Sequence, residues 1–277
     1  MLLAIDVGNT NITLGVYTSK GNKPLVIWRL VTDTRLTADE YGCKILDLFR
    51  NADMPSIDIR AVAIASVVPK INAAMAEMSE KYLKNKAFFV GKDEPRRPMK
   101  ILGNNTHELG ADRLANAVAA FEKFGGPCIV IDFGTATTFD CITKKGEYAG
   151  GAICPGPNVA IASLVKHTAQ LPMIQMARPK KYIGQSTVAC MQSGLYFGYV
   201  GLIKELLSGI KRELGMPPER HGLPKARQRQ SPRMGGMSKV IATGGLADIV
   251  LNEIKEVKHL IPELTLDGIR LIWKKSQ

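Results

Sequence analysis

One short pattern occurs twice in this chain, and it restricts the possible folds more than any other feature. The stretch 2–11 runs from four apolar residues into Asp-Val-Gly and then into small polar residues. The stretch 129–138 repeats that order as Ile-Val-Ile-Asp-Phe-Gly-Thr-Ala-Thr-Thr. An apolar run that ends in a Gly-containing polar turn and then resumes predicts a β-hairpin with an acid at its tip. Two such hairpins about half a chain apart predict a duplicated fold.

The tip of the first hairpin carries side chains that suit a metal-bound phosphate. Gly8 allows a close backbone approach, and Asn9 and Thr10 supply neutral hydrogen-bond donors. Asp6 can hold a hard cation directly or through water. Asp-x-Gly-Asn is also ordinary turn chemistry, and the second copy is what favours the phosphate interpretation. A third Gly-rich turn at 243–247 follows another apolar run.

Strand and helix patterns alternate along the chain, which favours the α/β class. The expected elements include a capping box with its helix, a buried strand and two later helices (37–40, 41–49, 57–65, 188–214 and 264–272). Gly125-Gly126-Pro127 interrupts the pattern before the second hairpin. We therefore expect one domain over 1–124 and a second over 125–277.

Asp112 is a candidate catalytic acid or base whose sequence context allows two interpretations. It follows Gly110 and Ala111 and precedes Arg113 in the first turn of an expected helix. An acid in a first helical turn also interacts favourably with the helix dipole without any catalytic role. The residues alone leave both interpretations open.

The formal net charge of +12 raises the question of a nucleic-acid partner. Part of that excess lies in residues 220–233, which hold Arg and Lys side chains and no acid. No aromatic side chain interleaves with them to form a stacking platform, so a solvated loop is the simpler interpretation. We do not expect nucleic-acid binding, and a positive field also attracts small anions.

The cysteines and the hydropathy bear on the compartment. The five cysteines show no C-x-x-C spacing and lie mostly in apolar runs, so we expect reduced thiols in or near the core of a cytoplasmic protein. No apolar run reaches the ~18 residues that a membrane-spanning helix needs. No P-loop motif is present, and the histidines lack metal-ligand spacing.

The paired Asp-x-Gly hairpins and the late Thr-Gly-Gly turn resemble the superfamily of acetate kinase, sugar kinases, Hsp70 and actin. Within it, four segments in this order resemble type III pantothenate kinases: 6–11, 110–113, 131–137 and 150–156. The resemblance implies two actin-like (ribonuclease H-like) α/β domains with a cleft between them. It also implies ATP-dependent phosphorylation of pantothenate, the first step toward coenzyme A.

The resemblance implies a phosphate-binding set drawn from all three turns. That set is Asp6, Val7, Gly8, Asn9, Thr10, Asn11 and Thr13 from the first hairpin, Gly134, Thr135 and Thr137 from the second, and Gly244 and Gly245 from the third turn. Asp6 is expected to hold Mg²⁺. Asp132, the counterpart of Asp6, is expected to bind a monovalent cation, K⁺ or NH₄⁺.

The same resemblance implies a substrate site and a homodimer. Gly110, Ala111 and Arg113 are expected to frame pantothenate, with Asp112 as the base that accepts its hydroxyl proton. Thr187 matches a substrate-contact position near the interface between subunits. The helix dipole and Arg113 are expected to hold Asp112 ionised.

One stretch departs from the family pattern, and other functions stay open. The family often has Tyr followed by Asn-Pro before the Gly-x-Asp-Arg motif, whereas this chain reads Leu-Gly-Asn-Asn-Thr at 102–106. The details of the pantothenate pocket are therefore open. The alternatives are a nucleotide-binding regulatory accessory protein on the same fold and another small-molecule kinase of the sugar or acetate type. The retained acids Asp6, Asp112 and Asp132 favour an enzyme.

Overall fold

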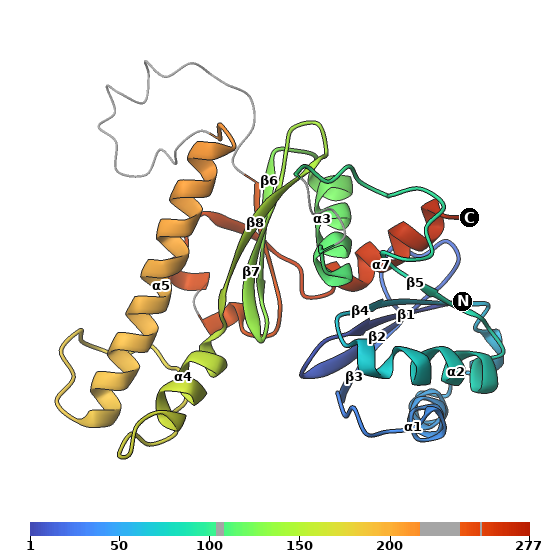
Figure 1. Cartoon of the computed structure of the whole chain (residues 1–277), viewed down its shortest axis with the longest axis horizontal. Coiled ribbons are helices and arrows are strands. Elements are labelled where there is room, and N and C mark those ends of the chain that lie inside the picture. Colours follow the sequence, from blue (N-terminus) through green and yellow to red (C-terminus); the bar gives the residue numbers. More distant parts are fainter. Residues whose placement is uncertain (104–107, 217–238, 250) are drawn as a thin grey trace. The chain divides into compact units, whose positions relative to one another are not determined.

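The computed structural model describes residues 1–103, 108–216, 239–249 and 251–277. The chain divides into two compact units (Figure 1). The first unit contains Met1–Glu122 and Glu263–Gln277, and the second contains Lys123–Pro262. The expected second domain, 125–277, was therefore wrong for the last segment of the chain, which packs on the first unit.

The first unit is built on a five-stranded sheet with the order β3-β2-β1-β4-β5. Its strands are β1 (Leu2–Val7), β2 (Asn11–Tyr17), β3 (Val26–Val31), β4 (Ala61–Ser66) and β5 (Ala87–Phe89). Its helices are α1 (Ala38–Asn51), α2 (Asn72–Leu83), α3 (Ala111–Phe124) and α7 (Leu264–Lys275), with short 3-10 turns at Ser56–Asp58 and Pro69–Ile71. Strands β1, β2 and β3 pair antiparallel, whereas β1, β4 and β5 pair parallel.

The second unit repeats this sheet. Its strands are β6 (Cys128–Phe133), β7 (Ala136–Ile142), β8 (Tyr148–Pro155), β9 (Lys239–Thr243) and β10 (Val257–Leu260). Its helices are α4 (Pro157–Lys166) and α5 (Thr187–Glu213), with 3-10 turns at Ala247–Ile249 and Leu251–Glu253. The order β8-β7-β6-β9-β10 matches β3-β2-β1-β4-β5 strand for strand, with the same parallel and antiparallel pairings. The predicted duplication is confirmed.

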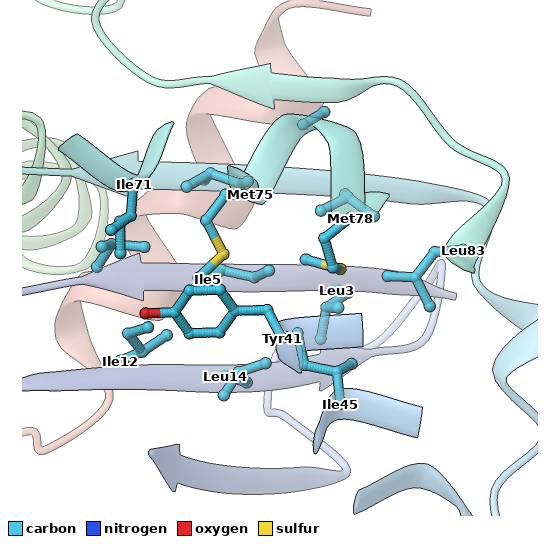
Figure 2. Packing of buried hydrophobic residues seen from close by; sticks show 14 of the residues in the cluster. Leu3, Ile5, Ile12, Leu14, Tyr41, Ile45, Ile71, Met75, Met78 and Leu83 are labelled. Atoms are coloured by element: carbon cyan, nitrogen blue, oxygen red, sulfur yellow. The ribbon is translucent and has the colours of Figure 1, made fainter. Parts of the chain in front are cut away.

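Side-chain alternation along β1 decides which residues enter the main core of the first unit. Leu3 and Ile5 point toward α1 and α2 and pack with Tyr41 and Met75 (Figure 2). Because successive side chains of a strand face opposite sides, Asp6 points to the other face of the sheet. The strand thus buries its apolar residues and leaves its acid outside that core.

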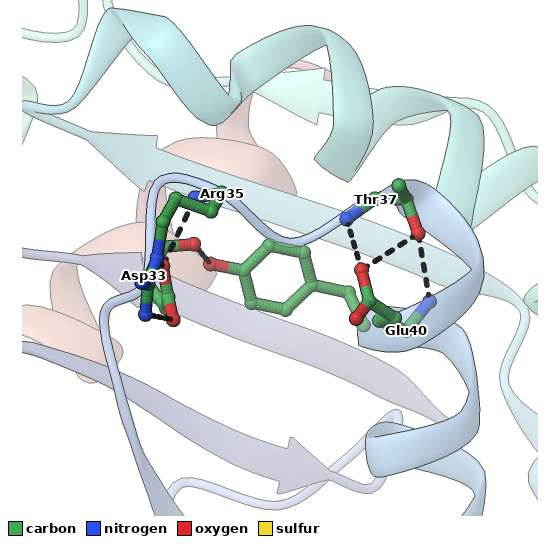
Figure 3. Close-up of polar contacts among 5 residues, drawn as sticks. Asp33, Arg35, Thr37 and Glu40 are labelled. Atoms are coloured by element: carbon green, nitrogen blue, oxygen red, sulfur yellow. Dashed lines mark hydrogen bonds and ion pairs between the residues drawn. The ribbon is translucent and has the colours of Figure 1, made fainter.

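The local predictions were mostly confirmed. Thr37 caps α1, and its capping box with Glu40 is complete (Figure 3). The helices expected over 188–214 and 264–272 correspond to α5 and α7. The strand expected over 57–65 begins later, at Ala61. Strands β3 and β8 were not predicted; both lie at a sheet edge, and their residues alternate mostly between exposed and half-buried positions.

Two general expectations had mixed outcomes. Cys128 and Cys141 are buried, and burial raises the pKa of the Cys128 thiol to about 12. Cys43 and Cys190 are exposed, so the expectation of core thiols was wrong for them.

In the described part of the chain, no helix combines the length and apolarity that a membrane crossing requires. The basic stretch 220–233 lies outside the described residues, as does the loop expected over 216–237 apart from Met216, which is buried.

Helix α7 completes the first unit from the far end of the chain. The Tyr17 hydroxyl donates a hydrogen bond of 3.0 Å to Asp267 Oδ1, and the Arg270 guanidinium lies 5.4 Å from the Tyr17 ring centre. Gly268 touches the backbone of Ala115 in α3 so closely that a Cβ atom at 268 would overlap the Ala115 carbonyl group. The contact between α3 and α7 therefore requires glycine at position 268.

Replacing Gly268 by Ala should lower the free energy of unfolding by at least ~1–3 kcal/mol, because the added methyl group forces α7 away from α3. Urea unfolding followed by circular dichroism measures the change. Gly209→Ala in α5 is the matched control, since a Cβ there meets no atom within 4 Å. Alanine favours helix over glycine by about 0.5–1 kcal/mol, so the control should be slightly more stable. Equal midpoints for both variants would contradict the proposed close contact.

Candidate active site

The two predicted hairpins have the same pattern of burial at every strand position. In β1 and β6 the fifth residue, Asp6 or Asp132, is half-buried while the other residues are buried. The third residue of the returning strand is also half-buried in both hairpins. The register pairs Asp6 with Thr13 and Asp132 with Thr138. Each hairpin therefore presents one carboxylate and one threonine side by side on the same face.

This comparison corrects the prediction for Thr137. The Thr137 side chain is fully buried, and its hydroxyl lies 2.5 Å from the Tyr199 hydroxyl of α5. It points away from the face that carries Asp132 and is the counterpart of Ile12. Thr138 is the counterpart of Thr13 and was missed. Because successive side chains of a strand face opposite sides, counting every second residue from Asp132 around the second hairpin would have identified Thr138.

The turn of the first hairpin is closed by backbone hydrogen bonds. The Gly8 N–H donates to the Asn11 carbonyl at 3.0 Å. Asn9, Thr10 and Asn11 are exposed, and Gly8 is half-buried. An added Cβ at Gly8 would lie 3.1 Å from the Asn11 carbonyl oxygen. The predicted phosphate-binding residues of this hairpin thus form a compact turn with three accessible polar residues.

Asp112 lies next to the strand ends that carry Asp6. The Val67 N–H, just after β4, donates to the Val7 carbonyl at 3.1 Å. An ideal Cβ on Gly110 would lie 3.4 Å from Val67 and 2.5 Å from the Asp112 carboxylate. Gly110 therefore lets α3 begin against the ends of β1 and β4. One edge of the first sheet brings together the first turn, Asp6 and the start of α3.

The surroundings of Asp112 raise the pKa of its carboxyl group. Burial is the largest cause, and it outweighs the opposing effects of the Arg113 N–H and the Arg113 charge. The Arg113 N–H donates to Asp112 Oδ1 at 2.7 Å. Arg113 lowers the pKa of Asp112, as expected, but burial outweighs this effect, so the net shift is upward. A raised pKa makes an ionised Asp112 a stronger proton acceptor than an exposed aspartate.

Three glycine-containing segments meet around Asp132 in the second unit. The Gly134 N–H donates to the Ala136 carbonyl at 3.2 Å. Gly244 has a φ of +90°, and a Cβ there would lie 2.5 Å from the Asp132 carboxylate. Gly156 donates its N–H to the Thr135 carbonyl at 3.0 Å. The predicted Gly134, Thr135 and Gly244 are thus neighbours.

Gly156 has a role that the sequence analysis missed. A Cβ at 156 would overlap the Gly134 carbonyl and lie 2.5 Å from the Thr135 carbonyl. Gly156 is also the N-terminal cap residue of α4, so the start of that helix lies against the second turn. The sequence analysis noted the motif 150–156 but assigned no contact to Gly156, its last residue.

The remaining predicted residues occupy separate places. Gly245 follows Gly244, and a Cβ there would meet no atom within 4 Å. Thr187 is exposed as the first residue of α5, after its capping residue Ser186. Across the described residues, no group of three or more His, Cys, Asp or Glu side chains could hold a metal ion alone. A cation at Asp6 or Asp132 therefore needs ligands from phosphate, water or the backbone.

Comparison with known proteins identifies the family. The type III pantothenate kinase profile matches residues 2–209. A type III pantothenate kinase of Endomicrobium trichonymphae is 43% identical over 279 residues, covering 99% of each chain. One from Myxococcus xanthus is 41% identical over 276 residues, covering 100% of this chain and 99% of the relative. The chain belongs to the type III pantothenate kinase family.

Solved structures agree with this type III pantothenate kinase chain in fold. A Baf-family protein from Campylobacter jejuni aligns with a TM-score of 0.55 and 16% identity, covering 99% of this chain and 98% of the other. A candidate 2-dehydro-3-deoxygalactonokinase from Sinorhizobium meliloti gives 0.54 and 13%, covering 99% and 96%. The expected actin-like α/β class, shared with sugar kinases, is confirmed.

Thr137 and Thr138 should respond differently to the same substitution. Thr137→Val should lower the unfolding midpoint, because Tyr199 loses its buried partner at a cost of about 1–3 kcal/mol. Thr138→Val should lower the midpoint less, because its hydroxyl makes only a long 3.4 Å hydrogen bond to Asp140 Oδ2, and it should raise KM for ATP, because it removes a hydroxyl beside Asp132. Thermal unfolding and initial rates measure both effects. A larger KM effect from Thr137→Val would refute the corrected assignment.

Proposed function

We infer that this chain transfers the γ-phosphoryl group of ATP to the hydroxyl of pantothenate and thereby carries out the first step of coenzyme A biosynthesis. Membership of the family gives the reaction. The observation that supports it in the chain itself is the position of Asp112, in the first turn of α3, beside the end of β1, which carries Asp6, and beside Val67, which follows β4. Phosphoryl transfer depends mainly on positioning and charge neutralisation, and this edge of the sheet supplies groups for both.

The residues divide into two tasks. Asp6 is the proposed Mg²⁺ ligand, and a carboxylate beside the hydroxyl of Thr13 suits a hard cation with bound water. Mg²⁺, when bound, neutralises charge on the phosphate oxygens. The turn Gly8–Asn11 and the second-unit turn with Gly134, Thr135 and Gly244 are the proposed phosphate-binding segments. These turns suit that role because each offers backbone at close range without bulky side chains.

Asp112 is the proposed base. The pantothenate hydroxyl attacks the γ-phosphorus, the bond to the bridging oxygen of ADP breaks, and the hydroxyl proton passes to Asp112. Arg113 is the proposed partner of the pantothenate carboxylate, since guanidinium and carboxylate form bidentate pairs. Gly110 and Ala111 are proposed to frame the substrate, and Thr187 stays a predicted substrate contact.

A coupled assay tests the function directly. ADP release by the purified chain should depend on pantothenate, and the product should be 4'-phosphopantothenate. A regulatory accessory protein would bind nucleotide without pantothenate-dependent turnover. A sugar or acetate kinase would respond to those substrates in a panel and not to pantothenate. No turnover with pantothenate would reject the proposal.

Asp112→Asn should lose at least ~10²-fold in kcat, because an amide cannot accept the proton. It should also raise the unfolding midpoint at neutral pH. Burial raises the folded-state pKa of Asp112, so its contribution to stability is present at low pH and is lost as pH rises through that pKa. At neutral pH the folded state therefore carries the free-energy cost of a buried ionised carboxylate, and Asp112→Asn removes that cost. Rate assays and thermal unfolding measure the two effects.

The two readouts separate catalysis from a structural role. A helix-dipole partner alone would lose stability in Asp112→Asn and keep its turnover. The kcat of the native chain should fall as pH drops through the raised pKa of Asp112. Asp58, an exposed acid of the same unit, gives a matched control as Asp58→Asn, whose kcat should be unchanged. Near-native turnover in Asp112→Asn would refute the assignment.

Asp132 is the proposed site of a monovalent cation. Its support is the duplication: Asp132 occupies in the second hairpin the position that Asp6, the proposed Mg²⁺ ligand, occupies in the first. Activity should rise when K⁺ or NH₄⁺ replaces Na⁺, and Asp132→Asn should remove that preference because the carboxylate is lost. Initial rates in the three chloride salts provide the measurement. Equal rates of the native chain in all three salts would contradict the role.

A homodimer is the proposed assembly. Gly194, Gly198 and Gly201 are exposed at i, i+4 and i+7 spacing on α5, where an added Cβ would meet no atom. Tyr182 and Ile183, just before α5, are 75% and 82% exposed. Light scattering should give about twice the chain mass, and Gly198→Glu should reduce it because a charge would be buried. An active native monomer would contradict the proposal.

A cytoplasmic location stays a prediction.

A further inference from the structure

The segment between β3 and α1 holds the turn of the first hairpin through Thr32. The Thr32 hydroxyl donates to the Gly8 carbonyl at 2.6 Å, and the Thr32 N–H donates to the Thr10 carbonyl at 3.0 Å. In a trans peptide the C=O and N–H groups point in opposite directions. Fixing these two carbonyls toward Thr32 therefore directs the N–H groups of Asn9 and Asn11 away from it. One residue sets the orientation of two peptide planes in the turn.

The segment is held in turn by α1. The Tyr41 ring is fully buried between the sheet and α2 (Figure 2), and its hydroxyl donates to the Asp33 carbonyl at 2.7 Å. The Asp33 carboxylate accepts hydrogen bonds from the Arg35 N–H, Nε and Nη2 at 3.0, 2.9 and 2.8 Å (Figure 3). A continuous path of contacts thus leads from the core through Tyr41, Asp33 and Thr32 to the turn.

We propose that Thr32 and Tyr41 are positioning residues for ATP, whose hydroxyl groups hold the first turn in the shape that receives phosphate. Thr32 acts directly on the turn, and Tyr41 acts through Asp33. The inference rests on the proposed function, in which Gly8–Asn11 contacts the phosphates. Its physical basis is preorganisation, because a turn with fixed N–H directions loses less conformational freedom when the nucleotide binds.

The first experiment removes and restores the Thr32 hydroxyl in the full chain. Thr32→Val keeps the shape of the side chain, whereas Thr32→Ser keeps the hydroxyl. KM for ATP at saturating pantothenate should rise about three- to ten-fold in Thr32→Val, which corresponds to the net value of one hydrogen bond. It should stay within about two-fold in Thr32→Ser, and kcat should change less than KM in both. Thr34→Val, at an exposed threonine of the same segment, is the control.

The second experiment tests the hydrogen bond that Tyr41 of α1 donates to the Asp33 carbonyl. It also keeps the proposal testable if Thr32→Val does not fold. Tyr41→Phe leaves the buried ring in place and removes only the hydroxyl. KM for ATP should rise about three-fold. Tyr82→Phe is the control, because its hydroxyl donates to a residue of α1 itself, Asp39, at 2.7 Å and not to Asp33. The combined Thr32→Val, Tyr41→Phe variant should be less than additive, since both act on one segment.

The outcomes separate positioning from structural support. A role in stability alone would lower the unfolding midpoint of Thr32→Val and leave KM for ATP within two-fold, which overturns the proposal. The proposal is also overturned if KM for ATP in Thr32→Ser rises as much as in Thr32→Val. Asn9→Ala, in the turn itself, tests the underlying phosphate assignment. If Asn9→Ala raises KM for ATP and Thr32→Val does not, the positioning role fails alone. If neither raises it, the assignment of the turn to phosphate fails as well.

Discussion

The parallel pairing of β1 with β4 is the constraint on which the first half of the site depends. It sets Val7 opposite Ser66, so that both strands end at one edge of the sheet. Val67 then bonds back to β1, and Gly110 starts α3 against Val67. Because side chains alternate along a strand, a slip of one residue would turn Asp6 into the apolar core with α1 and α2. The acid at the strand end is therefore positioned by the same register that buries Leu3 and Ile5.

The second unit repeats this strand pairing, but different segments pack around its acid. Its strand β6 pairs with β9, and Asp132 lies opposite Thr243. The neighbours of this acid come from glycine-containing turns, since Gly244 and Gly156 allow two other segments to approach. In the first unit the turn is instead supported by hydroxyl groups from the segment after β3. The two copies thus keep one strand pattern and differ in what packs on the turn.

Much of this could be predicted from the sequence because it is local. The hairpins, the capping box at Thr37 and the helix at 264–272 are determined by residues within a few positions of one another. The error at Thr137 came from reading a motif as a string, whereas the pleat of the strand decides which hydroxyl faces the acid. The sign of the Asp112 pKa could not be predicted, because burial depends on how α3 packs against distant strands. The roles of Thr32 and Gly156 depend on contacts between turns, which leave no periodic signal.

The position of α7 in the chain has a consequence for synthesis. This helix is made after the whole second unit, yet it packs on the first unit, which is otherwise made before it, and Tyr17 and Asp267 are 250 positions apart. A ribosome can release the whole of Lys123–Pro262 while the first unit still lacks one of its covering helices. Contacts between such distant segments form slowly, because a long loop must close before they contribute. The apolar residues that α7 covers therefore stay accessible to chaperones until this last segment of the first unit has been made.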